Sequence, residues 1–135
     1  MKRHDLEERL IAFAVLSIEI AGRLSDTKAG EHLSGQLLRS GTSPALNYGE
    51  AQSGESRKDF IHKIKIVLKE LRETGICLKI IDRARLCKAE DKIKSAILES
   101  NELISIFVKS VETAQKKNSL QKPYLHKSSI VNPCS

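Results

Sequence analysis

Residues 56–85 read SRKDFIHKIKIVLKELRETGICLKIIDRAR, and this stretch decides the fold. Its apolar side chains recur in alternating steps of four and three residues, with one interruption at Thr74. They are Phe60, Ile64, Val67, Leu71, Leu78 and Ile81. This spacing predicts a helix with one buried face. Such a helix would be about 40 Å long, and it needs neighbours of similar length because a lone helix of this composition is marginal in water.

Two local features of the stretch concern its start and its middle. Ser56 and Asp59 are three residues apart, as in a capping box with Asp in place of the usual Glu. Gly75 lies in the helix interior, where glycine costs up to about 1 kcal/mol relative to alanine. We therefore expect another backbone to pack closely against Gly75.

Three further helices are predicted around the long one, which spans about 56–86. Their bounds are about 5–24, 28–52 and 89–116. Apolar residues in 5–24 extend beyond one stripe, so we expect that helix to be buried on more than one side, at an inner position or by another subunit. In the second helix Leu33, Leu37 and Leu38 should face the core. Pro44 lacks an amide proton, and we expect the helix to continue there with a bend.

The short turns between these helices predict the architecture. Four helices joined by a few residues each favour an all-α, antiparallel up-down-up-down four-helix bundle over residues 1–117. Residues 118–135 are polar, contain two prolines and show no period. We expect them to form a flexible C-terminal tail.

The composition narrows the class of protein. A chain of 135 residues with five aromatic residues and no Trp suits one helical domain better than a β-sandwich. Cys77, Cys87 and Cys134 are odd in number and form no C-x-x-C pair, which favours reduced thiols in the cytoplasm and argues against zinc. Charged residues interrupt the first apolar segment, so we expect neither a signal peptide nor a membrane partner. No residue pattern indicates a cofactor.

The net charge of +6 is concentrated in one part of the chain. Residues 56–88 contain ten Lys or Arg and four acids, and the remainder contains thirteen of each sign. The excess therefore lies on the long helix and the turn after it.

Seven basic side chains follow one line along this helix, roughly opposite its apolar face. They are Lys58, His62, Lys65, Lys69, Arg72, Lys79 and Arg83. Such a row binds phosphate backbones through counterion release, which favours RNA or DNA as a partner. The alternative is a solvated face that keeps the protein soluble. No aromatic residues interleave the row, so we expect binding through shape and charge.

A second group of polar residues keeps helical spacing in the second and third helices. Its members are Arg39, Ser43, Asn47, Glu50, Glu70 and Glu73. An enzyme site would need a base poised by burial beside a nucleophile, and this group supplies no such pair. We interpret it as a buried polar network that fixes helix register or subunit contacts.

Arg57 and His62 give a third pattern, R-x4-H, which resembles the signature of HEPN ribonucleases. Those proteins are also helical bundles and cleave RNA without a metal. A spacing of five places the two residues on different sides of one helix turn, and a pattern of two residues often arises by chance.

Residues 34–81 resemble a family of bacterial four-helix-bundle proteins encoded in intervening sequences of large-subunit ribosomal RNA genes. The similarity covers about residues 6–114, and Pro44 leaves the subfamily open. The residues that carry it are Arg39, Ser43, Asn47 and Glu50, then Lys58, Asp59 and Phe60, then Glu70 and Glu73.

This resemblance implies a homopentamer whose bundles surround a central channel. The chain is also similar to accessory proteins of diversity-generating retroelements, which are basic pentamers that bind nucleic acid and a reverse transcriptase. We therefore expect a non-enzymatic, oligomeric interaction module that binds RNA or DNA through the basic row. The alternatives are a metal-independent, HEPN-like endoribonuclease and a purely structural oligomer.

Overall fold

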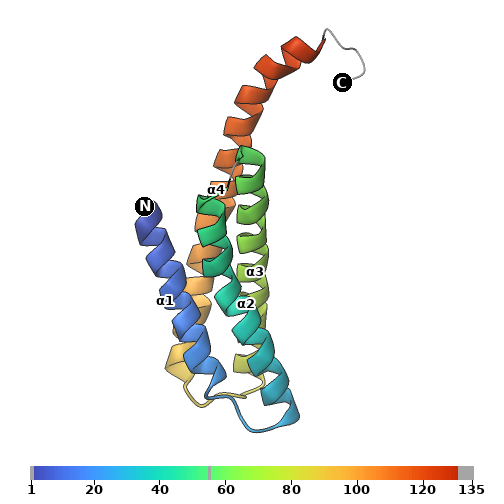
Figure 1. Ribbon diagram of the computed structural model, residues 1–135. Helices are drawn as coiled ribbons and strands as arrows, with labels where there is room; N and C mark the ends of the chain where they lie inside the picture. Colours follow the sequence, from blue (N-terminus) through green and yellow to red (C-terminus); the bar gives the residue numbers. More distant parts are fainter. Residues whose placement is uncertain (1, 55, 131–135) are drawn as a thin grey trace.

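The computed structural model describes residues 2–54 and 56–130, and four α-helices make up nearly all of these ranges. They are α1 (Arg3–Ala21), α2 (Lys28–Gln52), α3 (Arg57–Arg83) and α4 (Glu90–Ile130). Successive helices run in opposite directions (Figure 1). Helix α2 packs along both α1 and α3, and α3 packs along α4, whereas the contact between α1 and α4 is much smaller. The predicted all-α four-helix bundle is confirmed.

The helix bounds lie within three residues of the predicted ones except at the end of α4. Helix α2 spans 28–52 as expected and passes through Pro44 as one helix; the bend there stays a prediction. Helix α4 does not end near Lys116 but continues to Ile130 and includes Pro123. A proline removes one backbone hydrogen bond without always ending a helix. This last part of α4 projects beyond the other helices (Figure 1).

The rest of the predicted tail, residues 131–135, lies outside the described residues. The flexibility expected for the tail stays a prediction.

Local contacts set the ends of α3. The Ser56 hydroxyl accepts a hydrogen bond from the Asp59 amide at 3.1 Å, as the capping pattern predicted. At the other end Arg85 has φ 55°, and the amide of Leu86 donates to the carbonyl of Ile81 at 3.1 Å. This is a Schellman ending. It directs the turn so that the Ser25 amide can bond the Leu86 carbonyl at 2.8 Å, which ties the α1–α2 and α3–α4 turns together.

The buried face of α3 is the one that the spacing predicted. Ile64, Val67, Leu71, Leu78 and Ile81 are all buried, and Phe60 is half-buried. In α2, Leu37 is fully buried but Leu38 is 40% exposed, so the prediction that both face the core was wrong for Leu38. Adjacent residues of a helix point about 100° apart, and the core reaches only one of them.

Small residues from all four helices meet in the middle of the bundle, in a group that we call the central layer. A Cβ atom added at Gly41 would overlap the Ser17 hydroxyl and lie 2.5 Å from Ser17 Cβ, so α1 and α2 are in close contact there. A Cβ at Gly75 would lie 3.3 Å from the hydroxyl of Ser100 on α4. The neighbour of Gly75 is therefore a side chain and not the backbone that we expected. Members of the layer are Ser17, Gly41, Thr74, Gly75 and Ser100.

The close contact at Gly41 yields a stability prediction with a matched control in the same helix. Gly41→Ala should lower the free energy of unfolding by about 1–3 kcal/mol, the usual cost of overpacking a core. Gly35→Ala should raise it by up to about 1 kcal/mol, because no atom lies within 4 Å of the added methyl group. Urea unfolding followed by circular dichroism measures both. Equal effects of the two substitutions would contradict the packing described at Gly41.

Candidate nucleic-acid interface

The predicted basic row forms a surface feature on α3, which we call the basic ridge. Six of its residues are exposed and Lys79 is half-buried. From the first to the last residue it extends about 38 Å along the helix. Its members are Lys58, His62, Lys65, Lys69, Arg72, Lys79 and Arg83.

The ridge has one apolar interruption. Ile76 occupies the position between Arg72 and Lys79, and it is 57% exposed. The step of seven residues in the sequence row corresponds to this isoleucine. The ridge therefore consists of a longer basic part near the start of α3 and a shorter one near its end.

The acids of α3 turn away from the ridge and pair with neighbouring helices. Glu70 and Glu73 both accept hydrogen bonds from Arg39 of α2, and Asp82 bonds Lys94 of α4 at 3.1 Å. Among the described residues, no ridge residue takes part in an ion pair. Three of the four acids of α3 are thus paired with two cations of other helices, Arg39 and Lys94, and not with the ridge.

The second predicted group is divided by the structure into separate contacts. Arg39 bridges α2 and α3, with nitrogen-to-oxygen distances of 3.1 Å to Glu70 and 2.5 Å to Glu73. Asn47 donates to the Ser43 hydroxyl at 2.8 Å within α2. The residues therefore do not form one network, because their side chains reach different partners.

Glu50 makes the third contact of this group, with Lys63 of α3. Lys63 was not among the predicted site residues. Lys63 is thirteen residues from Glu50, across the α2–α3 turn, and this spacing could have indicated that the two side chains meet.

Glu70 is the most buried acid of the bundle, with a side chain that is 10% exposed. Burial raises the pKa of its carboxyl, and the adjacent Glu73 raises it further, while Arg39 acts in the opposite direction. Two carboxylates share one guanidinium, which lies 51% exposed at the surface. This arrangement holds α2 against α3, and no nucleophile accompanies it.

The structure places Arg57 and His62 in different surroundings. Arg57 lines a cavity at the start of α3, and His62 lies on the basic ridge and does not line that cavity. Within one chain the two residues do not form a common pocket. This agrees with their expected separation around the helix.

Helix α1 carries an exposed apolar stripe that the other helices leave uncovered. Ile11, Val15 and Ile18 follow steps of four and three residues and are 44%, 48% and 50% exposed. We call them the α1 stripe. Adjacent apolar side chains on one exposed helix face are typical of a protein contact.

Two comparisons with known proteins found matches to this chain. Residues 5–109 match the 23S rRNA-intervening sequence protein family. The chain is also similar to a crystal structure of a protein of unknown function from the S23 ribosomal protein family of Bacteroides thetaiotaomicron, with 31% identity and a TM-score of 0.74 over 83% of this chain and 99% of that one. No curated protein matches the chain. None of the described helices is long and apolar enough to cross a membrane.

The raised pKa of Glu70 leads to a pH-dependent stability difference. A carboxyl with a raised pKa binds more protons in the folded state, so its contribution to stability grows as the pH falls towards its unfolded value of 4.5. We compare the native protein with Glu70→Gln, which does not titrate. The free energy of unfolding of the native protein should rise relative to that of Glu70→Gln between pH 7 and pH 4.5, measured by urea unfolding.

The same comparison in a Glu73→Gln background serves as a control. Its pH dependence should be smaller, because one of the causes that raise the pKa of Glu70 is then absent. A native protein that loses stability relative to Glu70→Gln as the pH falls would show that the pKa is lowered instead.

Proposed function

Because this chain belongs to the 23S rRNA-intervening sequence protein family, we propose that it is a non-enzymatic, oligomeric module that binds RNA or DNA through the basic ridge of α3. One observation carries the proposal. Three of the four acids of α3 are paired with α2 and α4, whereas no described residue forms an ion pair with the ridge. A solvated face without this function would gain from mixing both charges along the same line.

The dimensions of the ridge suit a phosphate backbone. Over about 38 Å of duplex axis, or about one helical turn, one strand carries about 11 phosphates, and the ridge would contact those that face it. The exposed lysines and arginines of the ridge have long side chains, so they can follow a backbone without a fixed geometry. Binding would release condensed counterions and weaken steeply with salt, with little preference for sequence.

We further propose that the protein forms a homopentamer through the α1 stripe. The stripe is apolar, regular and uncovered in the single chain. A ring would repeat the ridge around its circumference and raise the affinity for a polyanion through several simultaneous contacts. We also propose a reverse transcriptase as the protein partner of such a ring, from the resemblance to retroelement accessory proteins that the sequence suggested.

A charge-matched pair of triple variants tests the ridge. Lys65→Gln, Lys69→Gln and Arg72→Gln together should lower the slope of log affinity against log salt by about 2–3, because about one counterion is released per cation. The control triple, Lys63→Gln, Lys92→Gln and Lys94→Gln, removes the same charge from lysines that are already ion-paired. Fluorescence anisotropy with a structured RNA measures both.

Two results would count against this proposal. Equal losses in both triples would mean that net charge, and not the ridge, attracts the RNA. RNA that is cleaved by the native protein but not by His62→Ala would support the endoribonuclease instead.

The oligomer has its own test. Light scattering should give five times the chain mass of 15.0 kDa, and Val15→Glu with Ile18→Glu should give a single chain of unchanged helicity. Charges on an apolar contact lose their hydration, so the assembly should dissociate. Leu98→Glu, at a leucine that is 67% exposed on α4, is the control. A native protein with the mass of one chain would exclude the ring.

A further inference from the structure

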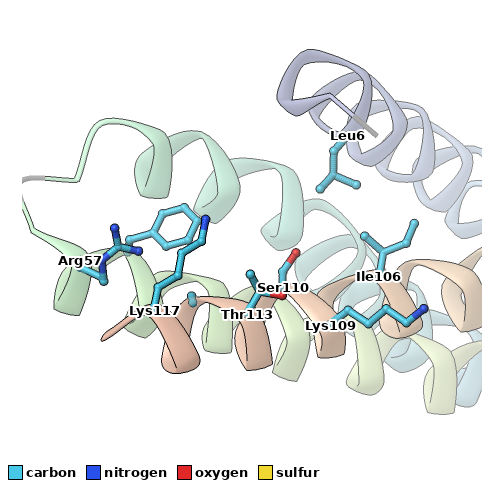
Figure 2. Close-up of a pocket in the computed structure, with 9 residues that line it drawn as sticks. Leu6, Arg57, Ile106, Lys109, Ser110, Thr113 and Lys117 are labelled. Atoms are coloured by element: carbon cyan, nitrogen blue, oxygen red, sulfur yellow. The ribbon is translucent and has the colours of Figure 1, made fainter. Parts of the chain in front are cut away.

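A cavity of about 460 Å³ lies at the end of the bundle where α3 begins. It is formed by the first turns of α1 and α3 and by residues 106–117 of α4. Figure 2 shows Arg57 and Lys117 towards one end of it, Ser110 and Thr113 near the middle, and Leu6 and Ile106 towards the other end. Pockets for small molecules commonly have volumes of about 300–1,000 Å³.

The lining combines an apolar floor with a basic rim. Leu6 and Ala114 are buried and Phe60 is half-buried, and these carry the floor together with Ile106. Three exposed cations, Arg57, Lys109 and Lys117, stand around it with the hydroxyls of Ser110 and Thr113. Among the described residues, no Asp or Glu lines the cavity.

A second cavity of about 390 Å³ adjoins the first and extends its character. The two share Arg57, Phe60 and Lys117, and the second adds Arg3 together with the polar side chain of Gln52. Its described lining residues also include no carboxylate. Arg3, Arg57 and Lys117 thus lie together near the start of α3, and Lys109 stands further along the first cavity.

The opposite end of the bundle provides a comparison within the same molecule. A cavity of about 430 Å³ there is lined by Arg23, Lys88 and Lys92, but also by Glu90 and Asp91. Cations and acids are mixed at that end. The unbalanced positive charge around the first cavity is therefore not a general property of the ends of this bundle.

We infer that the cavity at the start of α3 binds a nucleoside monophosphate unit. Arg57 and Lys117 would hold the phosphate, and the base would lie against Phe60, which is one turn along α3 from Arg57. The hydroxyls of Ser110 and Thr113 would bond the sugar or the base edge. A phosphate alone would leave the apolar floor unused, and a nucleoside alone would leave the cations unpaired. The unit can come from a free nucleotide or from the phosphorylated end of an RNA strand.

The inference is separate from the proposed function of the ridge. No residue of the basic ridge lines either cavity at the start of α3. A mononucleotide is also too small to engage a ridge of about 38 Å. Loss of RNA binding in the ridge variants and loss of nucleotide binding in cavity variants can therefore be told apart.

Isothermal titration calorimetry of the full chain with AMP, adenosine and inorganic phosphate tests the site. AMP should bind at least tenfold more tightly than adenosine or phosphate. Arg57→Gln with Lys117→Gln should weaken AMP binding at least tenfold. Arg23→Gln with Lys88→Gln removes the same charge from the opposite cavity and should leave the affinity for AMP unchanged. Phe60→Leu keeps an apolar side chain but removes the aromatic ring. It should weaken the binding of AMP more than the binding of phosphate.

Several outcomes would overturn the inference. These are no binding of AMP, equal losses in the two double variants, or phosphate binding as tightly as AMP. Displacement of AMP by a polyglutamate peptide at equal concentration would also overturn it, because the site would then accept any polyanion. Circular dichroism establishes that each variant keeps its helices.

A competition experiment identifies the source of the nucleotide. A short RNA with a 5′-phosphate should displace AMP from the native protein if the cavity takes a strand end, and the same RNA with a 5′-hydroxyl should not. If neither RNA displaces AMP, the ligand is a free nucleotide. The ridge triple variant should keep its affinity for AMP in both cases.

Discussion

The close approach of α1 and α2 at Gly41 is the constraint on which the rest of the bundle depends. No side chain fits between Gly41 and Ser17, and the same layer continues through Thr74 and Gly75 to Ser100. Small residues at one level of every helix fix how far each can slide, because a shift by one turn would bring larger side chains into the gap. Arg39 is two residues from Gly41, so this register also places its guanidinium beside Glu70 and Glu73.

The register of the helices determines the charge of the surface. The acids of α3 lie on its flanks, within reach of Arg39 on one side and Lys94 on the other. Salt bridges this exposed add little stability by themselves. Their effect is that the negative charges of α3 are paired with cations of neighbouring helices. The positive charges of the ridge are left facing solvent, which is what a surface for a polyanion needs.

The seam between α1 and α4 is the least closely packed of the bundle. It is bridged by polar side chains, with Arg9 bonding Glu99 at 2.8 Å and Glu102 at 2.7 Å, and Lys92 bonding Glu19 at 2.8 Å. Towards the start of α1 the seam opens into the cavity that Leu6 and Ile106 line. The loose seam thus leaves room for a ligand, while the tight layer at Gly41 holds the fold together.

The sequence by itself determined the four helices, the bounds of α2, the buried face of α3 and the line of the basic ridge. These features follow from spacing within one helix, and helical periodicity is a local property. It grouped Arg39 with Glu70 and Glu73, but it did not reveal the pairing of Glu50 with Lys63, the continuation of α4 past Lys116, or the placement of Arg57 and Lys117 on one cavity. Only the tertiary structure decided those features. Helical periodicity tells which face of a helix a residue occupies. It does not tell which neighbouring helix that face will meet, or at what level along the bundle.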